Sequence, residues 1–304
     1  MTEILFRQNL IMACYLLVGY WMYKKDWIPA EGSAAIAKLL LYFVTPMAIV
    51  KAFYTECTPD KLQNLLVSFA LAGLSLAVSM TVSGMLFGKE HPIENFGAAF
   101  SNAGFIGIPL VQAAMGAEAV FYISGFIVIL NILQWTYGVA LLSKDRKYIS
   151  ARKILTNPAL IAFAAGLLLY LSGIPLPTVL TEVIDQSAAM NGPLAMIVLG
   201  SYLAQLSLKS LLTDGRTYLC ALTRLLLIPA VTIILFSCMT FADADVKNAL
   251  FIVMAAPVGA NVAMFAQMYG GEYVKAVRPV CLSTVLCIVT LPLMTGIAEI
   301  LWKG

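Results

Sequence analysis

Charged side chains are scarce in this chain of 304 residues: Asp, Glu, Lys and Arg make up 12%, whereas soluble domains carry about 25%. Hydrophobic residues make up 61%, and the mean hydropathy is +0.89. A chain with so few charges cannot cover a soluble globular surface, so the composition predicts an integral membrane protein. The net charge of +3 is small and no basic run with interleaved aromatic residues occurs, which argues against a nucleic-acid partner.

Residues that carry most enzyme chemistry are also scarce. The chain has one histidine, His91, and contains no His-Glu-x-x-His, Gly-x-Ser-x-Gly or Walker-type motif. The six cysteines have no Cys-x-x-Cys spacing and five of them lie in apolar stretches, which favours small buried side chains. We therefore predict that the protein is not an enzyme and has no cofactor, so that a gradient or the membrane potential drives any transport.

No polar segment is long enough to form a soluble domain. Apolar segments of about 20 residues, the length that crosses a bilayer, instead follow one another with short loops. The first could pass for a signal peptide, but no small-residue cleavage site follows it, so we expect it to be retained. The ten predicted spans are 4–23, 33–53, 62–87, 95–115, 118–142, 154–172, 178–205, 216–240, 247–269 and 272–302.

Lysine and arginine are distributed unevenly between the loops. If the N-terminus is outside, the inner side holds 12 of the 19 and the outer side holds 5. The positive-inside rule therefore predicts both termini outside. The other two, Lys38 and Arg224, lie within spans. We expect Lys38 to snorkel to the headgroups, whereas Arg224 either snorkels or attracts an anion.

Two of the predicted spans carry residues that interrupt helices. Span 95–115 contains the string SNAGFIGIPL at 101–110, and span 247–269 contains APVGAN at 256–261. Proline removes a backbone donor and glycine weakens a helix. Freed backbone groups in hydrocarbon are tolerated where they pack in protein or line a polar cavity, so two such breaks predict a transporter's binding site.

The two halves of the chain repeat weakly. Because an odd number of spans per unit makes the second unit enter from the opposite face, five spans each predict an inverted repeat. The units are residues 1–143 and 154–304, joined by a cytoplasmic linker at 144–153. The pseudo-two-fold axis would bring the two interrupted spans together at mid-depth. The matching segments are 45–50 with 192–198 and 115–120 with 269–274.

The chemistry expected at the two breaks suits an anion. Half-helix N-termini carry partial positive charge and unpaired N–H groups, which suit a carboxylate. Asn102 and Asn261 each offer two donors and an acceptor, and span five adds Asn131 and Gln134 on one helical face. The alternative is that these amides satisfy freed backbone groups or join helices. The predicted substrate-binding residues are Asn102, Gly104, Gly107, Pro109, Asn131, Gln134, Pro257, Gly259, Asn261 and Gln267.

Asn102 with Gly-Ile-Pro-Leu at 107–110, and Ala-Pro-Val-Gly at 256–259 with Phe-Ala-Gln-Met-Tyr at 265–269, resemble helices four and nine of the auxin efflux carrier family. Asn157-Pro158 resembles the start of that family's asparagine–proline motif. The resemblance implies the fold of bile-acid symporters and sodium–proton antiporters, in which helices four and nine cross at the substrate site. It also implies a scaffold of spans 1, 2, 6 and 7, a transport domain of spans 3–5 and 8–10, and a homodimer formed through the scaffold.

The short loop at 144–153 is similar to that of the compact prokaryotic members, which are associated with malate, malonate and related carboxylates. We therefore expect a secondary transporter of a small organic anion in a bacterial cytoplasmic (inner) membrane, working by elevator-type alternating access. The substrate could be such a dicarboxylate or an auxin-like carboxylate, and coupling to Na⁺ or H⁺ is left open. The alternatives are a sodium-coupled organic anion symporter of the bile-acid type and a non-transporting membrane sensor.

Overall fold

The computed structural model describes residues 1–143, 146–207, 211, 213–269 and 272–302. Over this part of the chain the ordered elements are helices, and the β-type pairing consists of an isolated antiparallel bridge between Ser101 and Val258. Seven helices are long and apolar enough to cross a membrane. The prediction of an all-helical, multi-pass membrane protein is therefore confirmed. The seven are Thr2–Lys24, Ala30–Phe53, Pro59–Phe87, Ala117–Ser143, Thr178–Ala204, Gly215–Ser237 and Tyr273–Trp302.

Several of these helices consist of successive segments, some of which have 3₁₀ or π geometry. In chain order the elements are α1 (Thr2–Lys24), α2 (Ala30–Leu39), η1 (Leu40–Val44), α3 (Thr45–Phe53), α4 (Pro59–Phe87), α5 (Pro92–Ala99), η2 (Ala103–Gly107), α6 (Ile108–Met115), η3 (Ala117–Ala119), α7 (Val120–Leu133), η4 (Gln134–Gly138), α8 (Val139–Ser143), η5 (Arg146–Tyr148), α9 (Ala151–Leu155), α10 (Pro158–Ser172), α11 (Thr178–Ala189), α12 (Asn191–Ala204), α14 (Gly215–Leu222), η6 (Thr223–Leu227), α15 (Ile228–Ser237), α16 (Ala244–Met254), α17 (Asn261–Met268) and α18 (Tyr273–Trp302).

The remaining predicted spans are shorter or interrupted. The sixth corresponds to α10, which has 15 residues. In the fourth, α5 ends at Ala99 and helical structure resumes at Ala103. In the ninth, α16 ends at Met254 and α17 begins at Asn261. The count of ten crossings and their inverted topology stay predictions.

Prolines explain three of the four π-helical segments in the described part of the chain. The π-helical segments η1, η2 and η6 each end two residues before a proline: Pro46, Pro109 and Pro229 respectively. Proline has no N–H, and its ring clashes with the carbonyl of the residue four positions earlier. A wider turn before the proline relieves that clash, so the helix continues as a bulge.

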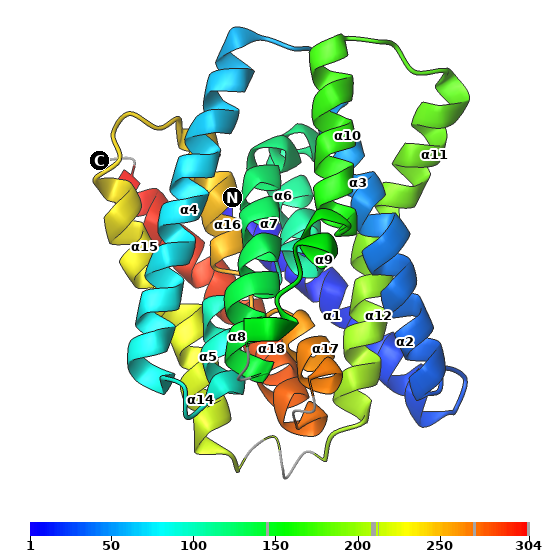
Figure 1. Ribbon diagram of the computed structural model, residues 1–304, viewed down its shortest axis with the longest axis vertical. Coiled ribbons are helices and arrows are strands. Elements are labelled where there is room, and N and C mark those ends of the chain that lie inside the picture. Colours follow the sequence, from blue (N-terminus) through cyan, green and yellow to red (C-terminus); the bar gives the residue numbers. More distant parts are fainter. Residues whose placement is uncertain (144–145, 208–210, 212, 270–271, 303–304) are drawn as a thin grey trace.

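The two ends of the helical body differ in charge. One end, at the bottom of Figure 1, carries the connections after α1 and α4 and the start of α14. We call it the basic end because it includes Lys24, Lys89 and Arg216. The opposite end carries the connections after α3, α10 and α15. Of the residues used in the charge and repeat predictions, Lys144, Lys209, Gly270, Gly271 and Lys303 lie outside the described residues.

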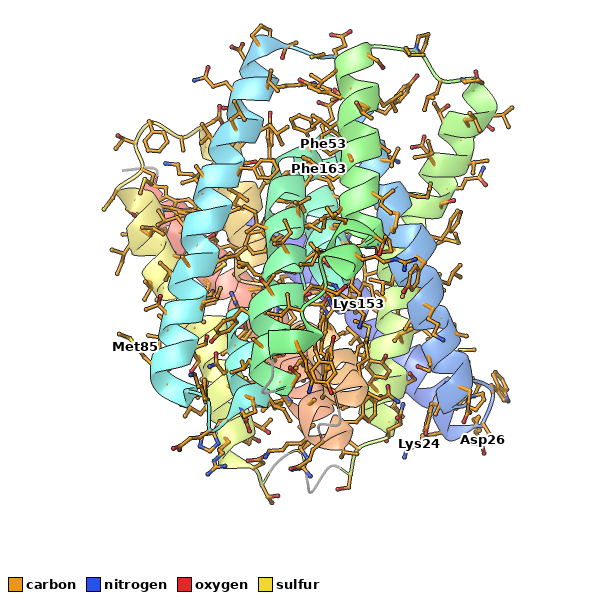
Figure 2. The ribbon with its side chains drawn as sticks, viewed as in Figure 1. Lys24, Asp26, Phe53, Met85, Lys153 and Phe163 are labelled. Carbon is orange, nitrogen blue, oxygen red and sulfur yellow. The ribbon has the colours of Figure 1, made fainter. Side chains whose placement is uncertain are left out.

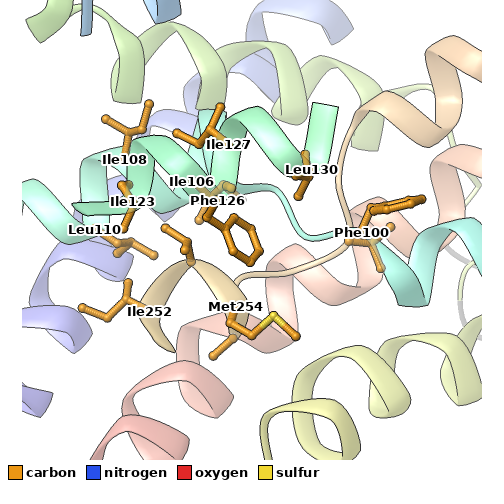
Figure 3. Packing of buried hydrophobic residues seen from close by; sticks show 14 of the residues in the cluster. Phe100, Ile106, Ile108, Leu110, Ile123, Phe126, Ile127, Leu130, Ile252 and Met254 are labelled. Carbon is orange, nitrogen blue, oxygen red and sulfur yellow. The ribbon is translucent and has the colours of Figure 1, made fainter. Parts of the chain in front are cut away.

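Helices that are far apart in the sequence pack side by side around the interrupted helices. α1 packs along α12 and also on α18, and α10 and α11 pack on α3. α4 packs on α5 and α7, while α14 and α17 pack on α18. The core beside the first break is apolar: Figure 3 shows Ile106 and Leu110 beside Ile123 and Phe126 of α7. The first interrupted helix is therefore packed directly against α7.

Candidate functional site

The two interrupted helices meet at their breaks, where their backbones pair. The N–H of Asn102 donates to the carbonyl of Pro257 (2.8 Å), and the N–H of Gly259 donates to the carbonyl of Phe100 (3.0 Å). The N–H of Val258 donates to Oγ of Ser283 on α18 (3.0 Å). These bonds satisfy groups that the broken helices leave free, so the crossing is stable at a depth where water is scarce.

The C-terminal ends of both leading half-helices are held by Arg224, whose side chain is fully buried. Its Nη1 donates to the carbonyls of Ala98 (3.1 Å) and Ala99 (3.3 Å) at the end of α5. Its Nη2 donates to the carbonyl of Met254 at the end of α16. Because helix C-termini carry partial negative charge, one guanidinium compensates both ends. Arg224 does not snorkel to the headgroups, and its cationic charge lies at the crossing.

The N-terminal ends of the following half-helices face a small cavity of about 40 Å³, which we call the central cavity. Asn102 caps η2, since its Oδ1 accepts from the N–H of Phe105 (3.3 Å). Its Nδ2 and the hydroxyl of Ser101 are buried and donate to no described atom. The central cavity thus presents free donors and helix N-termini together. Its lining includes Thr45, Ser101, Asn102, Gly104, Asn131, Gly259, Ala260 and Asn261.

Four amide side chains form two hydrogen-bonded pairs beside the central cavity. Nδ2 of Asn261 donates to Oε1 of Gln134 (2.8 Å), whose own Nε2 is buried without a described partner. Nδ2 of Asn157 donates to Oδ1 of Asn131 (3.1 Å), and Nδ2 of Asn131 donates to the carbonyl of Ile127 (2.8 Å). The pairs join α17 to η4 and α10 to α7, so the four amides hold helices together, and two of them, Asn131 and Asn261, also line the central cavity.

Thr45 and Asn191 form a further polar pair that the sequence reasoning missed. Oγ1 of Thr45 donates to Oδ1 of Asn191 (2.9 Å), whose Nδ2 donates to the carbonyl of Gly104 (2.9 Å). Thr45 directly precedes Pro46, and Asn191 lies two residues before Pro193, the proline of the matching segment. A polar residue before proline in both halves was the signal that could have identified them.

Two larger cavities lie next to the central cavity, towards the basic end. The Lys153 cavity, of about 230 Å³, is lined by Lys153, Thr156 and Asn157, and shares Asn131 and Asn261 with the central cavity. The Lys38 cavity, of about 600 Å³, includes Lys38 and Gln267 and also shares Asn261. Asn261 lines all three cavities, so this residue lies where they approach one another.

Six of the ten predicted binding residues line the central or the Lys38 cavity, and four line none of the three cavities. Asn102, Gly104, Asn131, Gly259 and Asn261 meet around the central cavity, and Gln267 lies in the Lys38 cavity. The others line none of these three cavities: Gln134 bonds to Asn261, and Pro257 accepts from Asn102. A Cβ on Gly107 would lie 2.8 Å from Val253, and one on Gly192 would lie 3.2 Å from Pro109. Gly107 and Pro109 therefore lie in close contacts between helices.

Aromatic side chains cluster on the side of the site that faces the end opposite to the basic end. Ring centroids of Phe53 and Phe121 lie 4.9 Å apart, those of Phe53 and Phe163 lie 5.3 Å apart, and those of Phe69 and Phe163 lie 5.5 Å apart. With Tyr170 these four residues form the outer aromatic cluster. Figure 2 shows Phe53 and Phe163 towards this end, with Lys153 between them and Lys24.

An all-helical membrane protein with a polar site at two interrupted helices has the architecture of a membrane transporter. The chain matches the family described as "Membrane transport protein" over residues 5–295, and it belongs to this family, that of the auxin efflux carriers. It is therefore a transporter and not an enzyme. It is also similar to a protein of Rhizobium meliloti (strain 1021) named "Putative malonate transporter", with 23% identity over 224 residues, or 71% of this chain and 68% of that protein.

Proposed function

We propose that this protein carries a small organic anion with a carboxylate group across the membrane, and that the carboxylate binds in the central cavity. The observation that carries the proposal is the pair of buried, unpartnered donors, Nδ2 of Asn102 and the hydroxyl of Ser101, at the crossing. A buried donor without an acceptor costs about 1–3 kcal/mol, so these groups favour a ligand that accepts hydrogen bonds. A carboxylate offers about four acceptor positions on two oxygens.

The electrostatics of the crossing also favour an anion over a cation. Two helix N-termini and two C-termini meet there, and their partial charges, about half an elementary charge each, nearly cancel. Arg224, bonded to the C-terminal ends, leaves a net positive charge. Among the described residues that line the three cavities there is no Asp or Glu. An anion therefore gains from this field, whereas Na⁺ would find no charged ligand in these linings.

The cavities and the packing support alternating access as the transport mechanism. We propose that the central cavity is reached from the basic end and that the outer aromatic cluster closes the opposite end. In our proposal α1, α2, α3, α10, α11 and α12 form the scaffold, and the remaining long helices form a transport domain that slides against it. The outer aromatic cluster would then have to separate, because Phe53 and Phe163 lie on the scaffold whereas Phe69 and Phe121 lie on the transport domain.

The orientation, substrate and assembly follow as parts of the same proposal. The positive-inside rule puts the basic end in the cytoplasm and both termini outside, in the inner membrane of a bacterium. The name of the Rhizobium protein makes malonate the first substrate to test. We propose a homodimer formed through the scaffold, as the family resemblance implies, with the coupling ion left open between Na⁺, H⁺ and none.

Counterflow in proteoliposomes tests the proposal. Vesicles loaded with unlabelled malonate or malate should accumulate the labelled compound when they contain the protein, and Asn102→Ala should abolish this accumulation. Asn95→Ala is the matched control, because Asn95 is equally buried but bonds to the carbonyl of Gly88 and lines none of the three cavities. If neither compound, nor any of a panel of other carboxylates, undergoes counterflow, a carboxylate carrier is the wrong function.

A further inference from the structure

The central cavity is too small for a whole organic anion. Its volume of about 40 Å³ accommodates a few water-sized groups, which is the size of one carboxylate head group. The rest of a substrate bound there must extend past Asn261 into one of the two larger cavities. Which cavity receives it decides what chemistry the second end of the substrate meets.

The Lys153 cavity is built for a polar and negatively charged group. Besides Lys153, its lining includes Asn131, Thr156, Asn157 and Asn261. Two of these, Asn131 and Asn261, also line the central cavity. The Lys153 cavity has less than half the volume of the Lys38 cavity, about 230 Å³ against about 600 Å³.

The ammonium group of Lys153 is held at this cavity without an anionic partner. Its Nζ lies 5.8 Å from the ring centroid of Trp135 and 5.9 Å from that of Tyr269, which places it between two aromatic faces. Within the described part of the chain, no Asp or Glu pairs with it. Two cation–π contacts position the charge but leave its hydrogen-bond donors free for a stronger acceptor.

The cation of the other cavity is less well placed. Lys38 lies on α2 and is exposed, and none of the described residues holds its ammonium group by a hydrogen bond, ion pair or ring contact. The walls around it are mixed: they combine Ala30, Ala34 and Ala37 with the polar side chains of Gln205, Gln267 and three tyrosines. An exposed lysine in this wider cavity would have to lose more side-chain entropy on binding than one already held between two rings.

We propose that Lys153 binds the second negatively charged end of the substrate and makes the carrier selective for dianions over monoanions. This inference rests on the proposed function, because it places the first carboxylate in the central cavity. In this arrangement one carboxylate accepts from Asn102 and Ser101, and the other accepts from Lys153. Lys153 is then a specificity-determining residue, and it belongs to the predicted linker, where no binding residue was expected.

The test compares two ligands that differ in the charge of one end. Malonate carries two carboxylates, and monomethyl malonate has a similar shape with one of them esterified. Each is used to compete with labelled malonate in counterflow, and is titrated in a thermal-shift assay on the detergent-purified protein, so that variants with weak transport are still measured. The wild type should bind malonate about 10- to 100-fold more tightly than the ester, the worth of one charge-assisted hydrogen bond.

Three variants locate the effect. Lys153→Gln should weaken malonate about 10- to 100-fold and leave the ester unchanged, so that the two ligands bind equally. Lys153→Arg keeps the charge and should restore most of the preference. Lys247→Gln is the matched control. Nζ of Lys247 also lies over a tryptophan, 5.8 Å from the ring centroid of Trp302, but Lys247 lines none of the three cavities.

The outcomes separate this inference from the proposed function. If malonate undergoes counterflow but the wild type does not distinguish it from its ester, the role of Lys153 is overturned while the carrier function stands. Equal weakening of both ligands by Lys153→Gln would make Lys153 a structural or gating residue and overturn the inference as well. A malonate-specific loss in Lys38→Gln instead would assign the second subsite to the Lys38 cavity.

Discussion

The side-chain amide of Asn261 donates a hydrogen bond to Oε1 of Gln134, at 2.8 Å, and so fixes the start of α17 against the middle of the fifth predicted span. Nε2 of Gln134 is buried beside this bond and has no partner among the described atoms. The pair can therefore reverse its polarity: if residue 261 became an acceptor, Gln134 could rotate its amide and donate Nε2 instead.

Asn261→Asp should abolish anion transport without unfolding the protein. The rotated Gln134 satisfies the new carboxylate, while its negative charge, at a residue that lines all three cavities, repels a substrate carboxylate. Uptake of labelled malonate into proteoliposomes should fall at least about tenfold, since such repulsion exceeds 1.4 kcal/mol at low dielectric. Asn248→Asp, on a partly exposed position of α16, is the control. Unchanged uptake in Asn261→Asp would remove Asn261 from the anion path.

Gly259→Ala should weaken the crossing itself. A Cβ at this position would lie 3.1 Å from the carbonyl oxygen of Ser101 and 3.2 Å from that of Phe100, and backbone atoms in paired segments cannot move aside. We expect a loss of about 1–3 kcal/mol of stability, read as a lower thermal unfolding midpoint in detergent, together with slower transport. Gly73→Ala is the control, since its nearest contact is Cδ1 of Ile129 at 3.9 Å. An unfolding midpoint equal to that of the wild type would mean that the two breaks do not pair as described.

The sequence predicted the helical class, and the two helix breaks that the structure shows lie in the strings where Asn, Gly and Pro interrupt apolar spans. Those residue types disfavour a continuous helix whatever surrounds them, so the helix breaks could be predicted from the local sequence. An amide in an apolar span needs a partner, so Asn102, Asn131 and Asn261 could be expected at a polar site. Each has a different partner: the N–H of Phe105, Asn157 and Gln134 respectively.

What the sequence could not supply was long-range pairing. The partners of Arg224 at Ala98 and Met254 are 126 and 30 residues away, and nothing in span 216–240 points to them. Gly107 and Pro109 share the motif of Asn102 but pack against other helices. A glycine near a helix break can allow two helices to pack closely as well as give a ligand access to the backbone, and the sequence does not distinguish these two roles. Lys153 lies in a basic segment that has the composition of a loop. Its place beside the cavity depends on the position of α9, which the sequence does not predict.

Arg224→Met should destabilise the protein more than loss of any surface cation. The change leaves the carbonyls of Ala98, Ala99 and Met254 without their buried donor, at a cost of about 3 kcal/mol or more. Thermal unfolding in detergent should show this loss, with Lys247→Met as the control. Arg224→Lys should recover only part of it, because an ammonium group cannot span both helix ends as a guanidinium does. If Arg224→Met unfolds at the wild-type temperature, Arg224 does not hold the crossing.

Asp214 should make the stability of the basic end depend on pH. Burial alone would raise the pKa of Asp214. The opposing influences lower the pKa below its ordinary value: hydrogen bonds from Oγ1 of Thr217 (3.0 Å) and the N–H of Arg216 (3.1 Å), and the charge of Arg278, whose Nη1 lies 3.5 Å away. Since the folded state favours the carboxylate, its contribution is present above the unfolded pKa of about 3.9 and is lost as the pH falls through the folded pKa.

Asp214→Asn keeps the N-cap of α14 but removes the charge, so it isolates this pH-dependent contribution. At pH 7 the wild type should unfold at a higher temperature than Asp214→Asn, and Asp214→Ala, which also loses the cap, should cost about 1 kcal/mol more. The gap between wild type and Asp214→Asn should close as the pH is lowered below about 3.9, because protonation then removes the same charge. A gap that stays constant from pH 7 to pH 3 would show that the carboxylate charge stabilises neither α14 nor its contact with α18.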